Sequence, residues 1–489
     1  MSNRSHQSSV PGPRSSADKV SRVLTDFTEW LDAYGETSWD HQSFFAGPVG
    51  GRAKSLYYRS GVIGTAAVAP MIFCEAFLPS ARRLFHHPLR FPIADAHYAM
   101  GFAFLYEATG DSAHLEKAVH FLNELTTSRC HDFKEYCWGY PFDWVWRGGV
   151  IKQQTPLITT TPYVYEAFLQ VYEIIERRDG LLKPEDSLQL GRANGSERGQ
   201  PPAHRSLRPG GRTEDRGETP EDFLCRYKQI LESIARHAAI DIKDFQISDR
   251  ASSCSYTPHD EGGVINAAAY RAFLLTSASK VLCRDEYWPI AERNLNFVLE
   301  NQNLDGSWPY AVDGVRDFID HFHTCFVVKA LVKIRALTGY EGCDEALTRG
   351  VEYYLKNLFD EDGLPKPFSK APRLTVYKRE LYDCAECINL CLLLRDRFPQ
   401  LEATLETVLK GVLKDWIKPD GSFRSRRLHF GWDNVPMHRW GQAQMFRSLA
   451  FYLREFRGPR TEGGGRTLER RGRKTEDRRQ RTEVATERK

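Results

Sequence analysis

The sequence predicts an all-α fold in which helical hairpins recur about every sixty residues and close into a toroid. Apolar residues recur at three- and four-residue spacing through most of the chain, as they do in helices with one buried face. The starts of alternate helices are evenly spaced, and several hairpins end in a similar Asp-Gly turn. Alternation typical of a β-strand is scarce, with its best example at 244–249.

Helical periodicity appears in eleven main segments, which the sequence places at 95–109, 113–127, 162–177, 220–239, 266–281, 286–301, 324–337, 343–358, 385–397, 401–416 and 440–456. Alternate helices begin near six marker residues: His97, Pro162, Asn266, His323, Asp383 and Trp440. These markers are separated by 65, 104, 57, 60 and 57 residues, and the long interval shrinks to about 63 when the segment 179–219 is left out. We therefore expect six inner helices with six outer partners, and segments 20–34 and 65–84 to complete the last pair or cap it.

The second helix of several pairs ends in an Asp-Gly turn followed by an aromatic residue. Examples are the segments 303–310, 360–368 and 418–423. Glycine permits the positive φ that such a tight turn requires, and the aromatic side chain then packs back or faces a cavity. A tight turn at one end of each hairpin and a longer loop at the other suits hairpins arranged in a ring.

Three segments have compositions that oppose folding: residues 1–18, 179–219 and 458–489. We therefore predict one toroid domain over residues 19–457, with a disordered insertion at 179–219. The C-terminal segment contains 11 Lys and Arg against 6 Asp and Glu, so the net charge of +3 leaves about −2 for the rest. A near-neutral folded part does not indicate nucleic-acid binding.

The cellular setting is predicted from what the sequence lacks. No apolar run reaches the roughly 18 residues of a membrane span, and residues 1–19 have no signal-peptide core. The eleven cysteines are scattered, often within apolar helical stretches, which favours a reducing cytoplasm over a disulfide framework. We expect a cytoplasmic protein that needs no cofactor.

Repeated helix pairs joined by Asp-Gly-aromatic turns resemble the (α/α) toroid superfamily, which includes six-hairpin glycosidases, polysaccharide lyases, sugar epimerases and terpene cyclases. Within it, the segments 137–144, 303–310 and 433–442 resemble bacterial exopolysaccharide-biosynthesis proteins of the VpsJ type. The likeness spans about residues 50–456. It implies an (α/α)6-type toroid, with an extra hairpin or cap, that binds an oligosaccharide or polysaccharide precursor.

Candidate site residues precede the inner helices, because the ligand cavity of such a toroid lies where the longer loops meet. The first cluster has aromatic residues that can stack on sugar rings beside groups that bind hydroxyls: Trp138, Tyr140, Asp143, Trp144 and Arg147. Further candidate binding residues are His259, Trp308, Tyr382 and Arg439, and further candidate catalytic residues are Asp320, His323, Asp383, Asp433 and His438. Structural interpretations compete throughout, since the same residue types plug cavities and cap helices.

Metal binding is a minor alternative. Asp320, His321 and His323 have ligand chemistry but no second cluster to complete a site, and Cys384 and Cys387 on an apolar helix are more typical of core. We expect no metal.

Four functions remain open from the residues. A glycosidase needs two carboxylates flanking the bond, for which Asp143, Asp320, Asp383 and Asp433 are candidates. A lyase or epimerase needs a His or Tyr base with an Arg, for which His323, His438, Tyr382, Arg147 and Arg439 would serve. The alternatives are a non-catalytic glycan-binding or assembly protein and an isoprenoid cyclase, although no Asp-rich diphosphate-binding motif is present.

Overall fold

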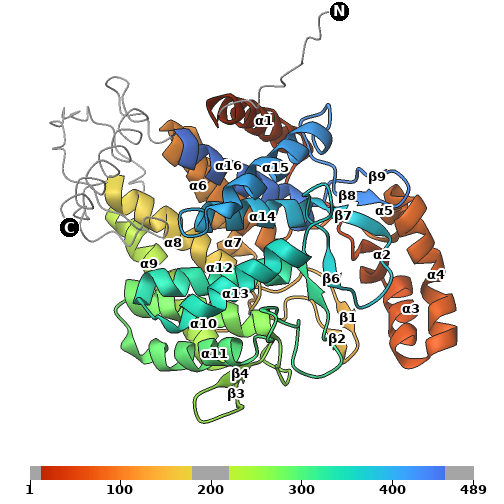
Figure 1. Ribbon diagram of the computed structural model, residues 1–489, viewed down its shortest axis with the longest axis horizontal. Coiled ribbons are helices and arrows are strands. Elements are labelled where there is room, and N and C mark those ends of the chain that lie inside the picture. Colours follow the sequence, from red (N-terminus) through yellow and green to blue (C-terminus); the bar gives the residue numbers. More distant parts are fainter. Residues whose placement is uncertain (1–12, 179–219, 458–489) are drawn as a thin grey trace, which may run out of the picture.

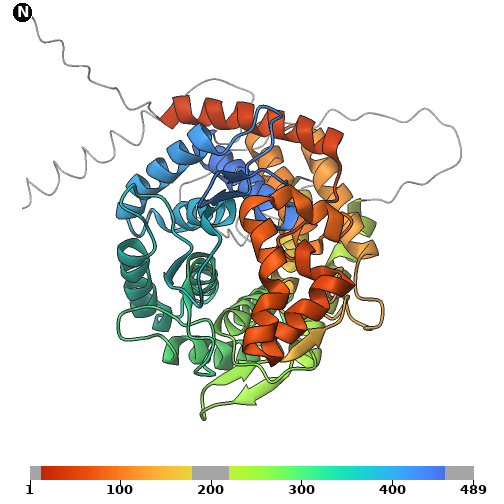
Figure 2. The same cartoon turned by 90° about the vertical axis from the view of Figure 1, so that its right-hand side faces the viewer.

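Six hairpins of α-helices form a closed ring. The computed structural model describes residues 13–178 and 220–457, so the predicted segments 179–219 and 458–489, and residues 1–12, lie outside the described residues. The inner helices are α6 (Pro92–Thr109), α8 (Thr161–Arg178), α10 (Ile265–Val281), α12 (His321–Thr338), α14 (Leu381–Leu394) and α16 (Ala443–Arg457). Each packs against the next, and α16 packs against α6, which closes the ring (Figure 2). The predicted toroid is confirmed.

The outer helices follow the inner ones along the chain, with one exception. They are α7 (Ser112–Thr127), α9 (Pro220–Arg236), α11 (Trp288–Glu300), α13 (Gly342–Asn357), α15 (Gln400–Asp415) and α1 (Pro13–Tyr34). The last inner helix, α16, takes α1 from the start of the chain as its outer partner. Helix α1 begins at Pro13, so its first residues overlap the segment 1–18 whose composition opposes folding.

Burial explains the two classes of helix. Inner helices such as α10 are buried on nearly every side, because they contact two inner neighbours and an outer partner. Outer helices bury one stripe, as α15 does with Leu401, Leu405, Val408 and Val412. The Asp-Gly turns also form as predicted, with φ of 91° at Gly306 and 87° at Gly421.

In the described part of the chain, nine short strands lie in the loops before the inner helices, at the end of the ring where these helices begin. They are β1 (Trp144–Trp146), β2 (Gly149–Ile151), β3 (Asp244–Gln246), β4 (Ser252–Cys254), β5 (Ile319–Asp320), β6 (Phe368–Lys370), β7 (Tyr377–Glu380), β8 (Arg426–Leu428) and β9 (Trp432–Asp433). All their pairings are antiparallel, and β3 lies within the strand predicted at 244–249. Short 3₁₀-helices are η1 (Pro79–Ala81) and η3 (Asp285–Tyr287), and short π-helices are η2 (His237–Asp241) and η4 (His438–Gln442).

A connecting segment of four α-helices links α1 to α6. It consists of α2 (Ser43–Ala46), α3 (Pro48–Arg59), α4 (Gly61–Phe77) and α5 (Arg82–Phe85), and α3 pairs with α4 at the edge of the molecule (Figure 1). The helix predicted at 65–84 therefore forms mainly as α4, but its partner is α3 and not an inner helix. The α3–α4 hairpin is therefore separate from the six hairpins of the ring and packs at its edge.

Candidate functional site

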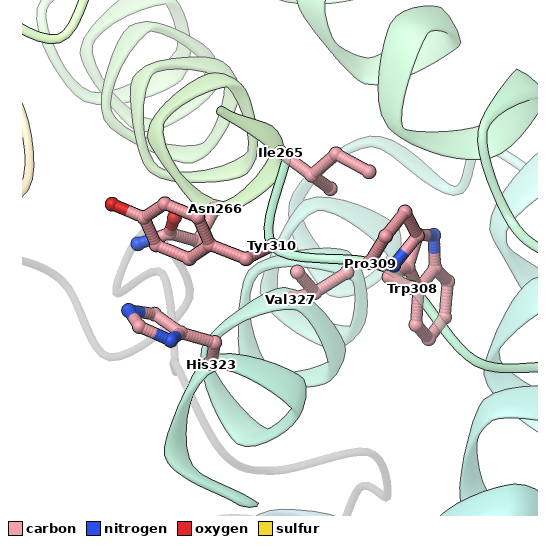
Figure 3. Close-up of a pocket in the computed structure, with 7 residues that line it drawn as sticks. All are labelled: Ile265, Asn266, Trp308, Pro309, Tyr310, His323 and Val327. Atoms are coloured by element: carbon pink, nitrogen blue, oxygen red, sulfur yellow. The ribbon is translucent and has the colours of Figure 1, made fainter. Parts of the chain in front are cut away.

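A small pocket opens at the N-terminal ends of two inner helices. Its lining residues come from α10, α12 and the turn before β5: Ile265, Asn266, Trp308, Pro309, Tyr310, His323 and Val327 (Figure 3). Two of them, Asn266 and His323, are marker residues of the repeat, so the pocket lies at the end of the ring where the sequence predicts the site. No carboxylate lines this pocket.

His323 is held by an aspartate. Asp320 is the N-cap of α12: its Oδ1 accepts from the backbone N–H of His323 (3.0 Å), and its Oδ2 lies 2.6 Å from Nδ1 of the same residue. Asp320 is buried, whereas 21% of the His323 side chain is exposed. This geometry places the proton on Nδ1 and leaves Nε2, which has no hydrogen bond among the described residues, as the basic atom.

Three tyrosines, Tyr310, Tyr256 and Tyr140, lie near one another, and Tyr310 contacts His323. The Tyr310 ring lies 4.7 Å from the His323 ring, and both side chains point toward the pocket in Figure 3. The Tyr256 hydroxyl accepts a hydrogen bond from Thr159 at 3.0 Å, and Trp144 lies between Tyr256 and Tyr140. Burial raises the pKa of all three tyrosines, so their hydroxyl groups remain protonated and can donate hydrogen bonds.

Arg439 provides a fixed positive charge beside the tyrosines. Its Nε and Nη2 donate to Asp40 at 2.9 and 2.7 Å, and its guanidinium lies 4.6 Å from the centre of the Tyr140 ring. Burial would raise the pKa of Asp40, but Arg439 and then His41 keep it well below its usual range. The pair is therefore ionised, and the positive charge of Arg439 opposes the burial that raises the pKa of Tyr256.

An aromatic stack continues from Arg439 toward α12. The Trp440 ring lies parallel to Tyr382, with centroids 4.8 Å apart, and its indole N–H donates to Glu380 at 2.8 Å. Phe322 packs edge-on against both rings and lies next to His323. The stack links the last repeat of the ring to the pocket.

The structure brings together seven of the predicted site residues. They are Tyr140, Trp144, Trp308, Asp320, His323, Tyr382 and Arg439, which lie in or beside the pocket. Trp308 is nevertheless nearly buried and donates its indole N–H to the carbonyl of Val298, so only part of its ring reaches the pocket.

The other predicted residues lie elsewhere and make structural contacts. Asp143 binds Lys152 and the backbone of Gln153 at the surface, and Arg147 and His259 are exposed. The buried Trp138 donates to the carbonyl of Leu125. Buried contacts also hold three further residues: Asp433 with Arg82 at 2.7 Å, His438 between Tyr98 and Gly35, and Asp383 with His321 at 3.7 Å.

Asp383 differs from the carboxylates above because neither of its oxygens accepts a hydrogen bond among the described residues. Burial, with the neighbouring Glu380 and Asp320, raises the pKa of Asp383 well above its usual range. Burial therefore favours the protonated form of this carboxyl group. Asp383 is fully buried and does not line the pocket.

The sequence interpretation missed Asp40, Tyr256, Asn266, Tyr310 and Trp440 as site residues. A signal existed for Tyr310, the aromatic residue after an Asp-Gly turn, and for Asn266 and Trp440, which are marker residues. Asp40 lies in the connection between α1 and α6, outside the repeat, and Tyr256 lies in the irregular loop before α10, where helix spacing gives no guide.

The three residues considered as metal ligands, Asp320, His321 and His323, do not converge on one point. His321 turns away from His323: its Nε2 lies 3.0 Å from the Tyr354 hydroxyl, and its Nδ1 faces Cys325 and Asp383. Within the described ranges, no group of three or more His, Cys, Asp or Glu side chains could hold a metal ion.

No protein-family model and no curated protein matches the sequence. Solved structures do match. An unsaturated glucuronyl hydrolase specific for heparin is 10% identical with a TM-score of 0.53, covering 91% of this chain and 98% of that one. A possible member of the GH105 family from Salmonella enterica serovar Paratyphi A is 13% identical with a TM-score of 0.52, covering 93% and 97%.

A sugar epimerase is also among the similar structures. Cellobiose 2-epimerase from Bacillus thermoamylovorans is 9% identical with a TM-score of 0.50, covering 75% of this chain and 88% of that one. These neighbours are carbohydrate-active enzymes with the six-hairpin, or (α/α)6, toroid. At such low identity the likeness shows that this chain has the same fold.

Proposed function

We propose that this protein is a carbohydrate-active enzyme in which His323 transfers a proton at a sugar carbon, as an epimerase or a lyase does. The pairing of His323 with Asp320 at the pocket is the observation that supports this proposal most directly. Nε2 would take the proton from a carbon next to a carbonyl or carboxyl group. The electron pair of the broken C–H bond would pass to the oxygen of that group.

The surrounding side chains suit this step. The developing oxyanion needs hydrogen-bond donors, and the protonated hydroxyl of Tyr310 lies beside His323. If the planar intermediate turns so that its other face meets protonated His323, return of the proton from Nε2 gives an epimer. Loss of a leaving group at the next carbon, with the electron pair of the broken C–H bond, gives an unsaturated sugar. A glycosidase mechanism fits less well, because Asp320 and Asp40 are both engaged and neither lines the pocket.

The biological setting is proposed from the sequence resemblance. Segments 137–144, 303–310 and 433–442, which resemble exopolysaccharide-biosynthesis proteins of the VpsJ type, contribute Tyr140, Tyr310, Arg439 and Trp440 to the site. The substrate is accordingly an oligosaccharide or polysaccharide precursor, and the proposed location is the cytoplasm.

The test is exchange of carbon-bound hydrogen. Reducing oligosaccharides and uronate-containing oligosaccharides are incubated with the protein in D₂O, and loss of a ring-proton signal or appearance of a vinyl proton is followed by NMR. We expect turnover by the wild type and a loss of roughly 10²- to 10⁴-fold in His323→Asn, the contribution typical of a general base.

The matched control is His259→Asn, which removes an exposed histidine outside the pocket and should retain activity. Saccharide binding by the wild type without any exchange would contradict the enzymatic proposal and establish the non-catalytic, glycan-binding alternative.

A further inference from the structure

The connecting segment between α1 and α6 exposes an unusual amount of apolar surface. Of the eighteen large hydrophobic side chains that are exposed in the described part of the chain, ten lie on or next to α3, α4 and α5. We call them the α3–α5 surface: Val49, Leu56, Tyr58, Val62, Ile63, Ile72, Phe73, Phe77, Leu78 and Leu84. Exposed apolar patches of this kind mark contact with a partner or a membrane.

Helix α4 has the composition of a buried helix in an exposed position. From Gly61 to Cys74 it contains no charged residue, yet Val62 is 86% exposed, Ile63 64% and Phe73 55%. A helix that is apolar on all sides is normally surrounded by other apolar groups. Among the described residues, α3, α2 and loop residues such as Phe430, which stacks on Phe77, cover part of it.

Basic residues border this apolar surface. Between residues 47 and 89 the chain has five Lys and Arg but one acid, Glu75, which binds Arg426. On α3, exposed Arg52 and Arg59 alternate with Val49 and Leu56 at three- and four-residue spacing, so they share one helix face. Within the described residues Arg52, Arg59 and the exposed Arg83 form no ion pair.

The hairpin stands on the face of the ring where the pocket opens. Helix α3 packs against β1, whose Trp144 belongs to the site, and the half-buried Lys54 lies near Arg439. Figure 2 looks onto this face, and the orange-red hairpin stands in front of the ring. None of the helices in the described part of the chain is long and apolar enough to cross a membrane.

We propose that the α3–α5 surface docks on a lipid bilayer with anionic headgroups. The exposed apolar side chains of α4 would enter the boundary between headgroups and acyl chains, and Arg52, Arg59 and Arg83 would contact lipid phosphates. A protein partner is less well supported, because α3 and α4 form a protruding hairpin rather than a groove and the unpaired charges are all of one sign. Docking would bring the pocket close to the bilayer; if the proposed function holds, its substrate would be a lipid-linked saccharide.

The test is co-sedimentation of the full chain with vesicles of phosphatidylcholine alone or with 30% phosphatidylglycerol. We expect binding to the anionic vesicles that weakens in high salt, since each basic side chain near an anionic surface contributes about fivefold. Val62→Glu with Ile63→Glu should reduce binding at least tenfold, and Arg52→Glu with Arg59→Glu should reduce binding and its salt dependence. Circular dichroism and the thermal midpoint should stay as in the wild type, because these side chains are exposed.

The control is Leu304→Glu, which adds a carboxylate at a fully exposed leucine outside this surface and should leave binding unchanged. Absence of vesicle binding, or binding that the hairpin variants do not weaken, would overturn the proposal. So would a dimer in sedimentation-velocity runs that Ile63→Glu dissociates, because the surface would then bind a second copy. Hydrogen exchange on soluble saccharides does not depend on vesicles, so failure of docking is distinguishable from failure of the proposed function.

Discussion

At the scale of single residues, Asp320 has two separable roles. Its carboxylate caps α12 through the backbone N–H of His323 and orients the imidazole through Nδ1. Asparagine is as good an N-cap as aspartate, whereas alanine removes the cap. The two substitutions therefore distinguish a contribution to the fold from a contribution to the reaction.

We predict that Asp320→Asn lowers kcat about 10- to 100-fold while KM and the thermal midpoint stay close to the wild-type values. Asp320→Ala should lower kcat and also cost about 1 kcal/mol of unfolding free energy. The measurements are steady-state kinetics and urea denaturation of both variants. Asp143→Asn, at the surface, is the control. Equal losses of stability in both Asp320 variants would show that the carboxylate matters for folding rather than for proton transfer.

The sequence predicted the residues of the site where they follow the repeat. His323 and Tyr382 lie at or next to marker positions, so the spacing placed them at one end of the ring. The same spacing also selected Asp383, Asp433 and His438, whose side chains turn into the interior. Position along a helix predicts depth in the ring, but the direction of the side chain depends on neighbouring repeats, which spacing does not reveal.

At the scale of secondary-structure elements, buried ion pairs join neighbouring inner helices. Lys329 of α12 binds Glu386 of α14, and both side chains are almost fully buried. Two desolvated charges satisfy each other here, so removal of one partner leaves an unpaired charge inside the ring.

We predict that Lys329→Met costs about 3–5 kcal/mol of unfolding free energy and that adding Glu386→Leu restores most of it. Urea denaturation of the single and double variants measures both values. The matched control is Lys117→Met, which breaks the exposed pair of Lys117 with Asp32 between α7 and α1 and should cost less than about 1 kcal/mol. A double variant that is less stable than Lys329→Met would show that the pair contributes beyond mutual neutralisation.

Most elements of the ring were predictable because the outer helices have one apolar stripe with a period near 3.6 residues, and the inner helices are largely apolar segments that begin at even spacing along the chain. The connecting helices between α1 and α6 were less predictable. Helix α4 is apolar on all sides, so its pattern indicates a core helix, and α3 contains two adjacent glycines that weaken a helical prediction. Tertiary contact explains one further glycine, since a Cβ at Gly64 would lie 2.3 Å from the Cα of Tyr57.

At the scale of the whole molecule, the two ends of the described chain meet. Helix α16 packs against α6 and α1, so the ring closes only when its last inner helix is in place. The closing contact is tight: a Cβ at Gly101 of α6 would lie 2.6 Å from the ring of Phe446 in α16. Closure of this kind lets six hairpins share one interior, and it buries polar side chains that a single hairpin would leave in water.

Among these buried groups are three histidines that make the ring sensitive to acid. His97, His321 and His438 are fully buried. Burial lowers the pKa of His321 to about 3 and of His438 to about 4, and burial together with Arg447 lowers that of His97. In the unfolded chain a histidine has a pKa of about 6.5. Above that pH these residues are neutral in both states, and their contribution to stability is fully present.

As the pH falls below about 6.5 the unfolded chain binds protons that the folded ring cannot accept, so stability is lost until the pH reaches the folded-state values. The limiting loss is about 1.4 kcal/mol per histidine per pH unit. We predict that the unfolding free energy, measured by urea denaturation at pH 7.5, 6.5 and 5.5, falls less steeply in His438→Gln than in the wild type. His259→Gln, which removes an exposed histidine, should keep the wild-type slope. Equal slopes in all three proteins would mean that His438 takes up its proton without unfolding of the ring.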